Sequence, residues 1–162
     1  MKILADGDSL PAELRAILAR RWLDASGKAA REGRSPPFGL VFVAARRPAL
    51  PAGIELVLVE AGPDSADDRL LELAAPGDLA VTRDLPLAER LAEKGLVVLN
   101  DRGDVFTSGN VRERRSLRDR AAELRVAGVV PESPRGRRWG PKELKSFADA
   151  FDRELIRALR AG

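Results

Sequence analysis

The sequence predicts an α/β protein, a three-layer α/β/α sandwich in which helices cover both faces of a mostly parallel sheet of about five strands. Short apolar runs of strand length alternate along the chain with longer segments whose apolar residues recur at helical spacing. These runs are apolar at nearly every position, which is typical of parallel strands that are buried on both faces. The chain of 162 residues is long enough for one such unit, so we expect a single domain over 1–162.

The first part of the chain is expected to hold three strands and one helix. Residues 2–6 are an apolar run that ends in an acid, and the helix over 11–24 begins at a proline, a residue favoured in the first helical turn. The runs 39–45 and 54–59 are continuous, apolar and rich in β-branched residues, as strands are. Residues 26–37 are rich in Gly, Pro and Arg and are expected to form a loop. The residues that give the helix its apolar spacing are Leu14, Ile17, Leu18 and Trp22.

Helices and strands continue to alternate in the second part. The expected helices are 64–75, 86–94, 110–127 and 141–159. The expected strands are 79–82 and 96–99, followed by a short edge strand at 105–106. The segment 130–140 carries Pro, Gly and Arg and is expected to be a mobile loop between the last two helices. The C-terminal helices would close the sandwich.

The composition excludes several kinds of chemistry. The chain has no Cys and no His, which removes disulfides, thiolate nucleophiles, Ser-His-Asp arrangements and the commonest ligands of transition metals. Carboxylate and carbonyl oxygens remain, and these suit hard cations such as Mg²⁺ and Mn²⁺. No apolar run approaches the roughly 20 residues of a membrane span, and the N-terminus does not read as a signal peptide. We therefore expect a cytoplasmic protein that does not contact the membrane.

Acidic residues fall where parallel strands are expected to end. Asp6 ends the first strand, Asp8 follows in the next turn, and Asp84 lies just past the strand over 79–82. Asp67 and Asp68 lie in or near the first turn of the helix that precedes this strand. Because ligands bind at the carboxyl ends of strands in open parallel sheets, these acids are expected to converge on one edge. Clustered carboxylates repel one another unless a cation lies between them, which predicts a site for Mg²⁺ or Mn²⁺.

The same acids allow a structural interpretation. Asp8, Asp64 and Asp84 all precede expected helices, and Asp is a common N-cap residue. Capping explains any one of them, but it explains the combination less easily, because Asp6 ends a strand and Asp67 follows an acid at Asp64. Both interpretations stay open at the level of the sequence.

Three stretches resemble a known family. They are MKILADGDSLP, the segment from DSADDRLLELAAPGD through TRDLPLA, and LNDRG followed by NVRERRSLRD. Their spacing is similar to that of the YaiI/YqxD family, a group of small and largely uncharacterised bacterial proteins with a PIN-like fold. The resemblance extends from Met1 to about Gly128 and is densest over 64–119. Residues 129–162 diverge and are expected to be a helical extension of the domain.

The resemblance implies a metal-dependent nuclease site. PIN-like nucleases hold Mg²⁺ or Mn²⁺ for RNA cleavage, and the matching positions here give the metal ligands as Asp6, Asp8, Asp67 and Asp84. By the same resemblance the catalytic residues are Asp6, Asp67, Thr82 and Asp84. The family's C-terminal block is matched by Asn100, Arg102, Asn110, Arg112, Glu113, Arg118 and Asp119. Several positions depart from the family pattern. Gly7 and Ser9 stand in place of Ala, Leu10 in place of Cys, and Arg46 and Asp68 in place of Asn.

The helix expected over 110–127 carries many arginines. At about 100° per residue, Arg114, Arg118 and Arg125 fall on one stripe of the helix. Arginine binds phosphate in a bidentate manner, so this helix is expected to hold a nucleic-acid backbone. The other interpretation is a solvated face whose arginines pair with acids on the same helix. The residues expected to contact phosphate are Arg102, Asn110, Arg112 and Arg118.

Three functions remain open. The first is a Mg²⁺- or Mn²⁺-dependent nuclease or phosphodiesterase that acts on RNA. The second is a phosphatase of the haloacid-dehalogenase type, since Asp6 and Asp8 match its nucleophile pair. An immediate helix start after Asp8 leaves no room for that enzyme's flap, which argues against it. The third is a non-catalytic module that binds RNA or a protein partner. The glycines form no dinucleotide-binding fingerprint, so we expect no nucleotide cofactor.

Overall fold

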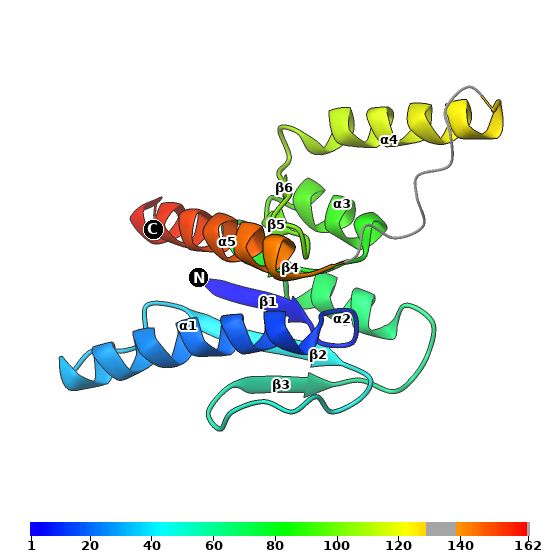
Figure 1. Cartoon of the computed structure of the whole chain (residues 1–162). Coiled ribbons are helices and arrows are strands. Elements are labelled where there is room, and N and C mark those ends of the chain that lie inside the picture. The colour runs from blue at the N-terminus through cyan, green and yellow to red at the C-terminus, as the bar shows by residue number, and fades with distance from the viewer. Residues whose placement is uncertain (129–138, 162) are drawn as a thin grey trace.

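The computed structural model describes residues 1–128 and 139–161, which form one six-stranded sheet covered by helices (Figure 1). The strands are β1 (Lys2–Asp6), β2 (Gly39–Ala44), β3 (Glu55–Leu58), β4 (Leu79–Val81), β5 (Val97–Leu99) and β6 (Val105–Phe106). The helices are α1 (Ala12–Arg31), α2 (Ser65–Leu73), α3 (Leu85–Glu93), α4 (Val111–Val126) and α5 (Pro141–Ala161). The α/β class and the alternation of elements are therefore confirmed.

The sheet runs in the order β3-β2-β1-β4-β5-β6. Neighbours from β3 to β5 are parallel, and only the pairing of β5 with the edge strand β6 is antiparallel. The chain first builds outward from β1 through β2 to β3, then returns to the other side of β1 with β4. The order of the strands thus reverses between β1 and β4, and this reversal opens a crevice at their carboxyl ends.

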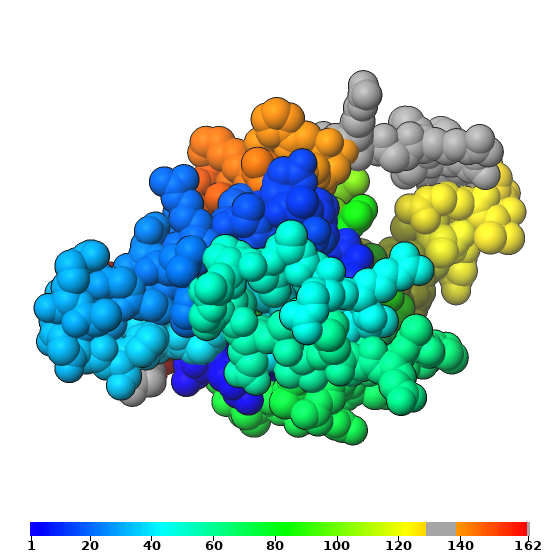
Figure 2. Space-filling model, turned by 90° about the horizontal axis from the view of Figure 1, so that it is seen from below, coloured from blue at the N-terminus to red at the C-terminus, as the bar shows by residue number. Residues whose placement is uncertain are grey.

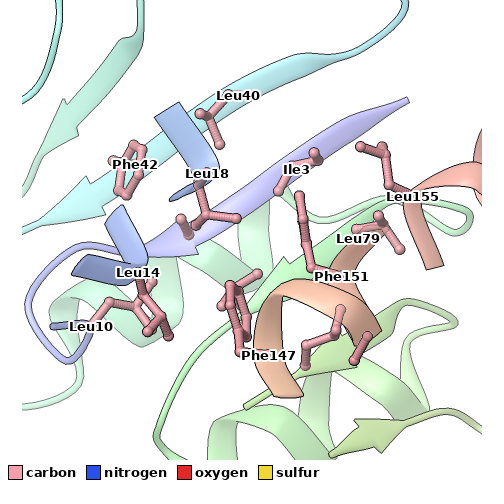
Figure 3. Close-up of a cluster of buried hydrophobic side chains, with 14 of the residues drawn as sticks. Ile3, Leu10, Leu14, Leu18, Leu40, Phe42, Leu79, Phe147, Phe151 and Leu155 are labelled. Carbon is pink, nitrogen blue, oxygen red and sulfur yellow. The ribbon is translucent and has the colours of Figure 1, made fainter. Parts of the chain in front are cut away.

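Each face of the sheet has its own core because successive strand residues point to opposite sides. Ile3 and Phe42 lie in the core under α1 and α5, while Leu4 and Val43 lie in the core under α2 and α3. This explains why the strands are apolar throughout. In the first core, shown in Figure 3, side chains of α1 and α5 meet those of β1, β2 and β4. The labelled residues there are Ile3, Leu10, Leu14, Leu18, Leu40, Phe42, Leu79, Phe147, Phe151 and Leu155.

The last helix is part of this core. Phe147 and Phe151 of α5 are fully buried, and their rings stack with centroids 5.8 Å apart. Glu154 of α5 is also buried and pairs with Arg153 and Arg157. The segment beyond residue 139 thus completes the layer that covers one face of the sheet.

Two expectations need correction. Residues 26–31 are not a loop, because α1 continues through Gly27 to Arg31. The buried Ala29 and the basic Lys28 and Arg31 of the last turn favour the helix there, where the Gly content of the segment predicted a break. The first helix also does not begin directly after Asp8, because Pro11 is its N-cap. The expected loop at 130–140 lies outside the described residues except for its last two positions.

Helix α4 is the most exposed of the described helices and contacts the body of the molecule through α3. It lies over α3 and extends beyond the sheet, and its yellow atoms protrude from the body in Figure 2. Val111 is its only buried residue in the described structure. In the described residues, no helix is long and apolar enough to cross a membrane.

Candidate functional site

The expected acids meet at the crevice between β1 and β4. A cavity of about 390 Å³ opens there, between the carboxyl ends of the strands and the start of α2. Four of its lining residues, Asp6, Asp8, Asp67 and Asp84, were expected from the sequence, and the structure brings all four together. The parallel sheet thus places acids from residues 6 to 84 around one space.

A chain of hydrogen bonds joins the acids of β1 and β4. The hydroxyl of Thr82 donates to Oδ2 of Asp6 over 2.8 Å, and it accepts from the backbone N–H of Asp84 over 3.0 Å. Asp6 and Thr82 are both buried. Oδ1 of Asp6 accepts from the N–H of Ser9 over 3.2 Å. The Asp6 carboxylate is thereby held in one orientation.

Asp84 has a structural role as well as a place in the cavity. It is the N-cap of α3, and its Oδ1 accepts from the N–H of Leu87 over 2.8 Å. Pro86 follows within the first turn, where a missing N–H costs nothing. The capping interpretation is correct for this residue, yet the cap also fixes the carboxylate at the mouth of the cavity. One side chain therefore serves both interpretations.

Asp67 lies in the first turn of α2 and lines the same cavity. Its pKa is raised to about 6, first by partial burial and then by the negative charges of Asp84, Asp6 and Asp64. Arg90 lowers this pKa, but its effect is smaller than that of the acids. Carboxylates that raise one another's pKa values are stabilised by a positive charge placed between them.

Asp8 holds the end of β2. Its carboxylate accepts from the N–H of Ala45 over 2.6 Å and from that of Arg46 over 3.3 Å. It is therefore not the N-cap of a helix. Both carboxylate oxygens are already in hydrogen bonds, so Asp8 is less available to a ligand than Asp67 or Asp84. Arg46, a departure from the family pattern, contributes its backbone to this contact.

The cavity also contains residues that the sequence did not single out as site residues. Asp64, Ser9 and Ser65 line it. Asp64 precedes α2 with a left-handed backbone, at φ 59°, and its side chain makes no capping bond. It is the one described residue other than glycine with a positive φ. The sequence did carry a signal for Asp64. This acid precedes a helix that already has two acids in its first turn.

Two other departures from the family pattern, Asp68 and Leu10, lie outside the cavity lining. Asp68 is exposed and forms an ion pair with Arg90, with 3.4 Å between the charged atoms. Leu10 is buried in the core between α1 and α5. Leu10 therefore contributes to core packing at the position where the family has a cysteine.

The expected phosphate contacts are divided among different surroundings. Arg102, Asn110 and Arg118 line a second cavity of about 760 Å³ beside α4. There Arg118 pairs with the buried Glu89 over 2.6 Å. The amide of Asn110 accepts from Thr107 N–H and donates to the Val105 carbonyl, so it shapes the turn before α4. Arg112 is exposed and does not line this cavity.

The carboxylate oxygens of the acidic cavity are ligands that hard cations prefer. The acidic side chains do not, however, converge on one shared ligand position. Among residues 1–128 and 139–161, no three acids lie close enough together to form a ready metal site. All the charged side chains that line the cavity are aspartates. Such an arrangement can hold a cation through carboxylates and water, and it can orient water through Thr82 and the serines.

Known bacterial proteins are similar to this chain over nearly its whole length. A family model described as "Uncharacterized BCR, YaiI/YqxD family" matches residues 6–157. A relative from Myxococcus xanthus is 42% identical over 99% of this chain and 97% of its own length. Relatives from Syntrophobacter fumaroxidans and Treponema denticola are 36% and 38% identical, again over 99% of this chain, and over 97% and 95% of their own lengths. All three carry the description "UPF0178 protein".

Proposed function

The chain belongs to the YaiI/YqxD family, and we propose that it is a Mg²⁺- or Mn²⁺-dependent nuclease or phosphodiesterase that acts on RNA or another phosphodiester. The observation that carries the proposal is the convergence of acids from β1, α2 and β4 on one cavity, at the point where the strand order reverses. Parallel sheets bind ligands at this point. With no His or Cys in the chain, an all-oxygen site is the chemistry that these residues support.

The residues in the cavity fit a divalent cation. The pKa of Asp67 is raised to about 6, first by partial burial and then by the repulsion of neighbouring carboxylates, and a cation would remove that repulsion. Asp6, Asp67 and Asp84 would hold the ion, directly or through water, and Asp8 would complete the site from the turn after β1. When bound, such an ion lowers the pKa of a coordinated water and stabilises negative charge on phosphate oxygens.

The protein's own groups would position the reactants. The Thr82 hydroxyl holds Oδ2 of Asp6, so one edge of this carboxylate is fixed while the residue stays buried. The N-cap bond of Asp84 leaves its other oxygen for the cavity. Arginines of α4 would bind the backbone of the nucleic acid beside the acids.

A second candidate is a non-catalytic RNA- or partner-binding module. It is favoured by the lack of a ready three-acid metal site among the described residues. Such a module would bind RNA with strong salt dependence through its arginines, but it would neither bind Mn²⁺ tightly nor cleave RNA.

The test is cleavage of a pooled, end-labelled RNA by the purified chain with Mn²⁺, Mg²⁺ or EDTA. We expect cleavage that needs the metal, is lost in Asp84→Asn, and is unchanged in Asp68→Asn. Asp68 is a matched control, because it neighbours Asp67 in sequence but pairs with Arg90 outside the cavity lining. RNA binding without cleavage by any of the proteins would favour the binding module instead.

A further inference from the structure

The larger cavity beside α4 has a composition unlike that of the acidic one. This α4 pocket, of about 760 Å³, lies between α3, α4 and the segment that follows β5. Its volume is within the range of small-molecule sites. Its apolar lining is Leu85, Phe106 and Leu117, and its arginines are Arg102, Arg114 and Arg118.

The pocket contains a flat cationic surface. The guanidinium of Arg114 lies over the ring of Phe106, with 5.0 Å from Cζ to the ring centroid. Phe106 is buried, whereas the Arg114 side chain is 40% exposed, so Arg114 presents this surface to solvent. Leu117, one turn further along α4, is 58% exposed despite being apolar. A planar guanidinium beside an exposed apolar side chain is a surface on which nucleobases stack.

The charges of the pocket favour a base over a phosphate. Arg118 forms an ion pair with Glu89, and Arg114 lies 3.7 Å from a carboxylate oxygen of Asp104. These acids offset the positive charge that a phosphate would need. A neutral planar group avoids this problem, because it stacks on the guanidinium and meets donors and acceptors at its edges.

Other arginines of α4 are better placed for phosphate. Arg112 and Arg120 are exposed and have no ion-pair partner among the described residues. By helical spacing, Arg112 falls on the side of α4 opposite Arg114. The exposed Arg112 and the pocket residue Arg114 thus lie on different faces of the same helix.

The two cavities lie on either side of the start of α3. Asp84 lines the acidic cavity, and the next residue, Leu85, lines the α4 pocket. The pair Arg83–Asp101, 2.9 Å apart, holds the segment after β5 against this start. We propose that the α4 pocket receives an unpaired nucleobase of an RNA strand whose neighbouring phosphodiester lies at the acids. This inference rests on the proposed function, and it makes single-stranded RNA the substrate class.

The experiment compares two RNAs with the same number of phosphates. One is a short single-stranded RNA that carries fluorescent 2-aminopurine at one internal position, and the other has abasic sites at this position and its neighbours. Affinity is measured in EDTA, so that neither a metal site nor cleavage contributes. The full chain is tested as wild type and as Arg114→Ala, Leu117→Ala, Leu124→Ala and Arg112→Ala. Leu124 is the matched control, since it is 38% exposed on the same helix but does not line the pocket.

We expect the intact RNA to bind the wild type more tightly than the abasic RNA, with quenching of the 2-aminopurine as it stacks. Arg114→Ala and Leu117→Ala should each weaken binding of the intact RNA by roughly tenfold and leave the abasic RNA unaffected. Arg112→Ala should weaken both RNAs alike, and Leu124→Ala neither. Leu117→Ala removes an exposed side chain, so it tests the pocket even if Arg114→Ala disturbs the turn at Phe106.

Three results would overturn the inference: equal losses on the two RNAs, no loss in either pocket variant, or no RNA binding by the wild type. Failure of the proposed metal site is distinguishable from these. In that case Asp84→Asn and the wild type would still show the base-dependent binding in EDTA, while neither would bind Mn²⁺ or cleave RNA.

Discussion

The Thr82 hydroxyl donates a hydrogen bond of 2.8 Å to Oδ2 of Asp6, and both residues are buried at the carboxyl edge of the sheet. The same hydroxyl accepts from the N–H of Asp84. Two neighbouring strands are thereby joined at their ends by side chains as well as by the sheet. Without this donor the buried Asp6 carboxylate would lose a hydrogen bond, and water could not easily replace it because the site is buried. The contact therefore serves both the fold and the orientation of the site.

Replacing Thr82 tests this contact. Thr82→Val keeps the shape of the side chain but leaves the Asp6 carboxylate and the Asp84 N–H without the hydroxyl. We expect the free energy of unfolding to fall by about 1–3 kcal/mol, measured by urea denaturation at pH 7. Thr82→Ser keeps the hydroxyl and should lose less. Equal stabilities of Thr82→Val and the wild type would contradict the structural role.

Asp67 should lower stability at neutral pH in the absence of metal. Its pKa is about 6 in the folded protein, above the ordinary value of 3.8 for an aspartate side chain. The folded state therefore binds more protons than the unfolded state between these values, and stability falls as the pH rises through this window. The cost is absent below about pH 4 and complete above about pH 6.

We therefore expect Asp67→Asn to stabilise the metal-free protein at pH 7. The gain should be on the order of 1 kcal/mol, because solvent screens this half-exposed group. It should vanish below pH 4. Thermal unfolding in EDTA between pH 4 and 8 measures the effect, with Asp68→Asn as the control. A gain that does not change with pH would show that the repulsion among the acids is not its source.

Arg118 and Arg112 should differ in their effect on stability. Arg118→Ala removes the nearer ion pair of the buried Glu89 and leaves the more distant one with Arg115, at 3.9 Å. We expect a loss of about 1–3 kcal/mol and faster amide hydrogen exchange in α4. Arg112→Ala removes an exposed side chain and should change stability by less than about 0.5 kcal/mol. Identical stabilities of the two variants would mean that the Glu89 pair does not anchor α4.

Salt dependence separates phosphate contacts from other roles. Arg112→Ala should reduce the slope of log affinity against log salt for single-stranded RNA by about 0.7, the value for one phosphate contact. Filter binding at several salt concentrations measures the slope. Arg160→Ala, an exposed arginine at the end of α5, should leave it unchanged. If the two variants have the same slope as the wild type, Arg112 does not contact phosphate.

Much of the fold could be predicted from local patterns. The apolar runs give β1, β2, β4 and β5 to within a residue or two because each strand is buried on both faces. The end of α1 was missed, since Gly27 is a weak helix residue and the packing that overrides it comes from the folded core. Local sequence carries no record of such tertiary contacts.

The sequence predicted which residues line the candidate site better than it predicted the hydrogen bonds that they form. The rule for parallel sheets brings Asp6 and Asp84 together, and the structure confirms their meeting at one cavity. That Asp8 would bind the end of β2 depends on the register of β1 with β2, which no single segment encodes. The α4 pocket was likewise hidden, because it joins Leu85, Phe106 and Arg114 from three separate elements.

The most direct test of the central proposal is a calorimetric titration of the metal-free protein with Mn²⁺ at pH 7. The wild type and Asp68→Asn should bind with the same affinity, while Asp84→Asn and Asp67→Asn should lose most of the binding. The loss in Asp67→Asn should occur even though that variant is the more stable protein, which separates binding from folding. No binding by the wild type, or equal binding by all four proteins, would contradict a metal site at these acids.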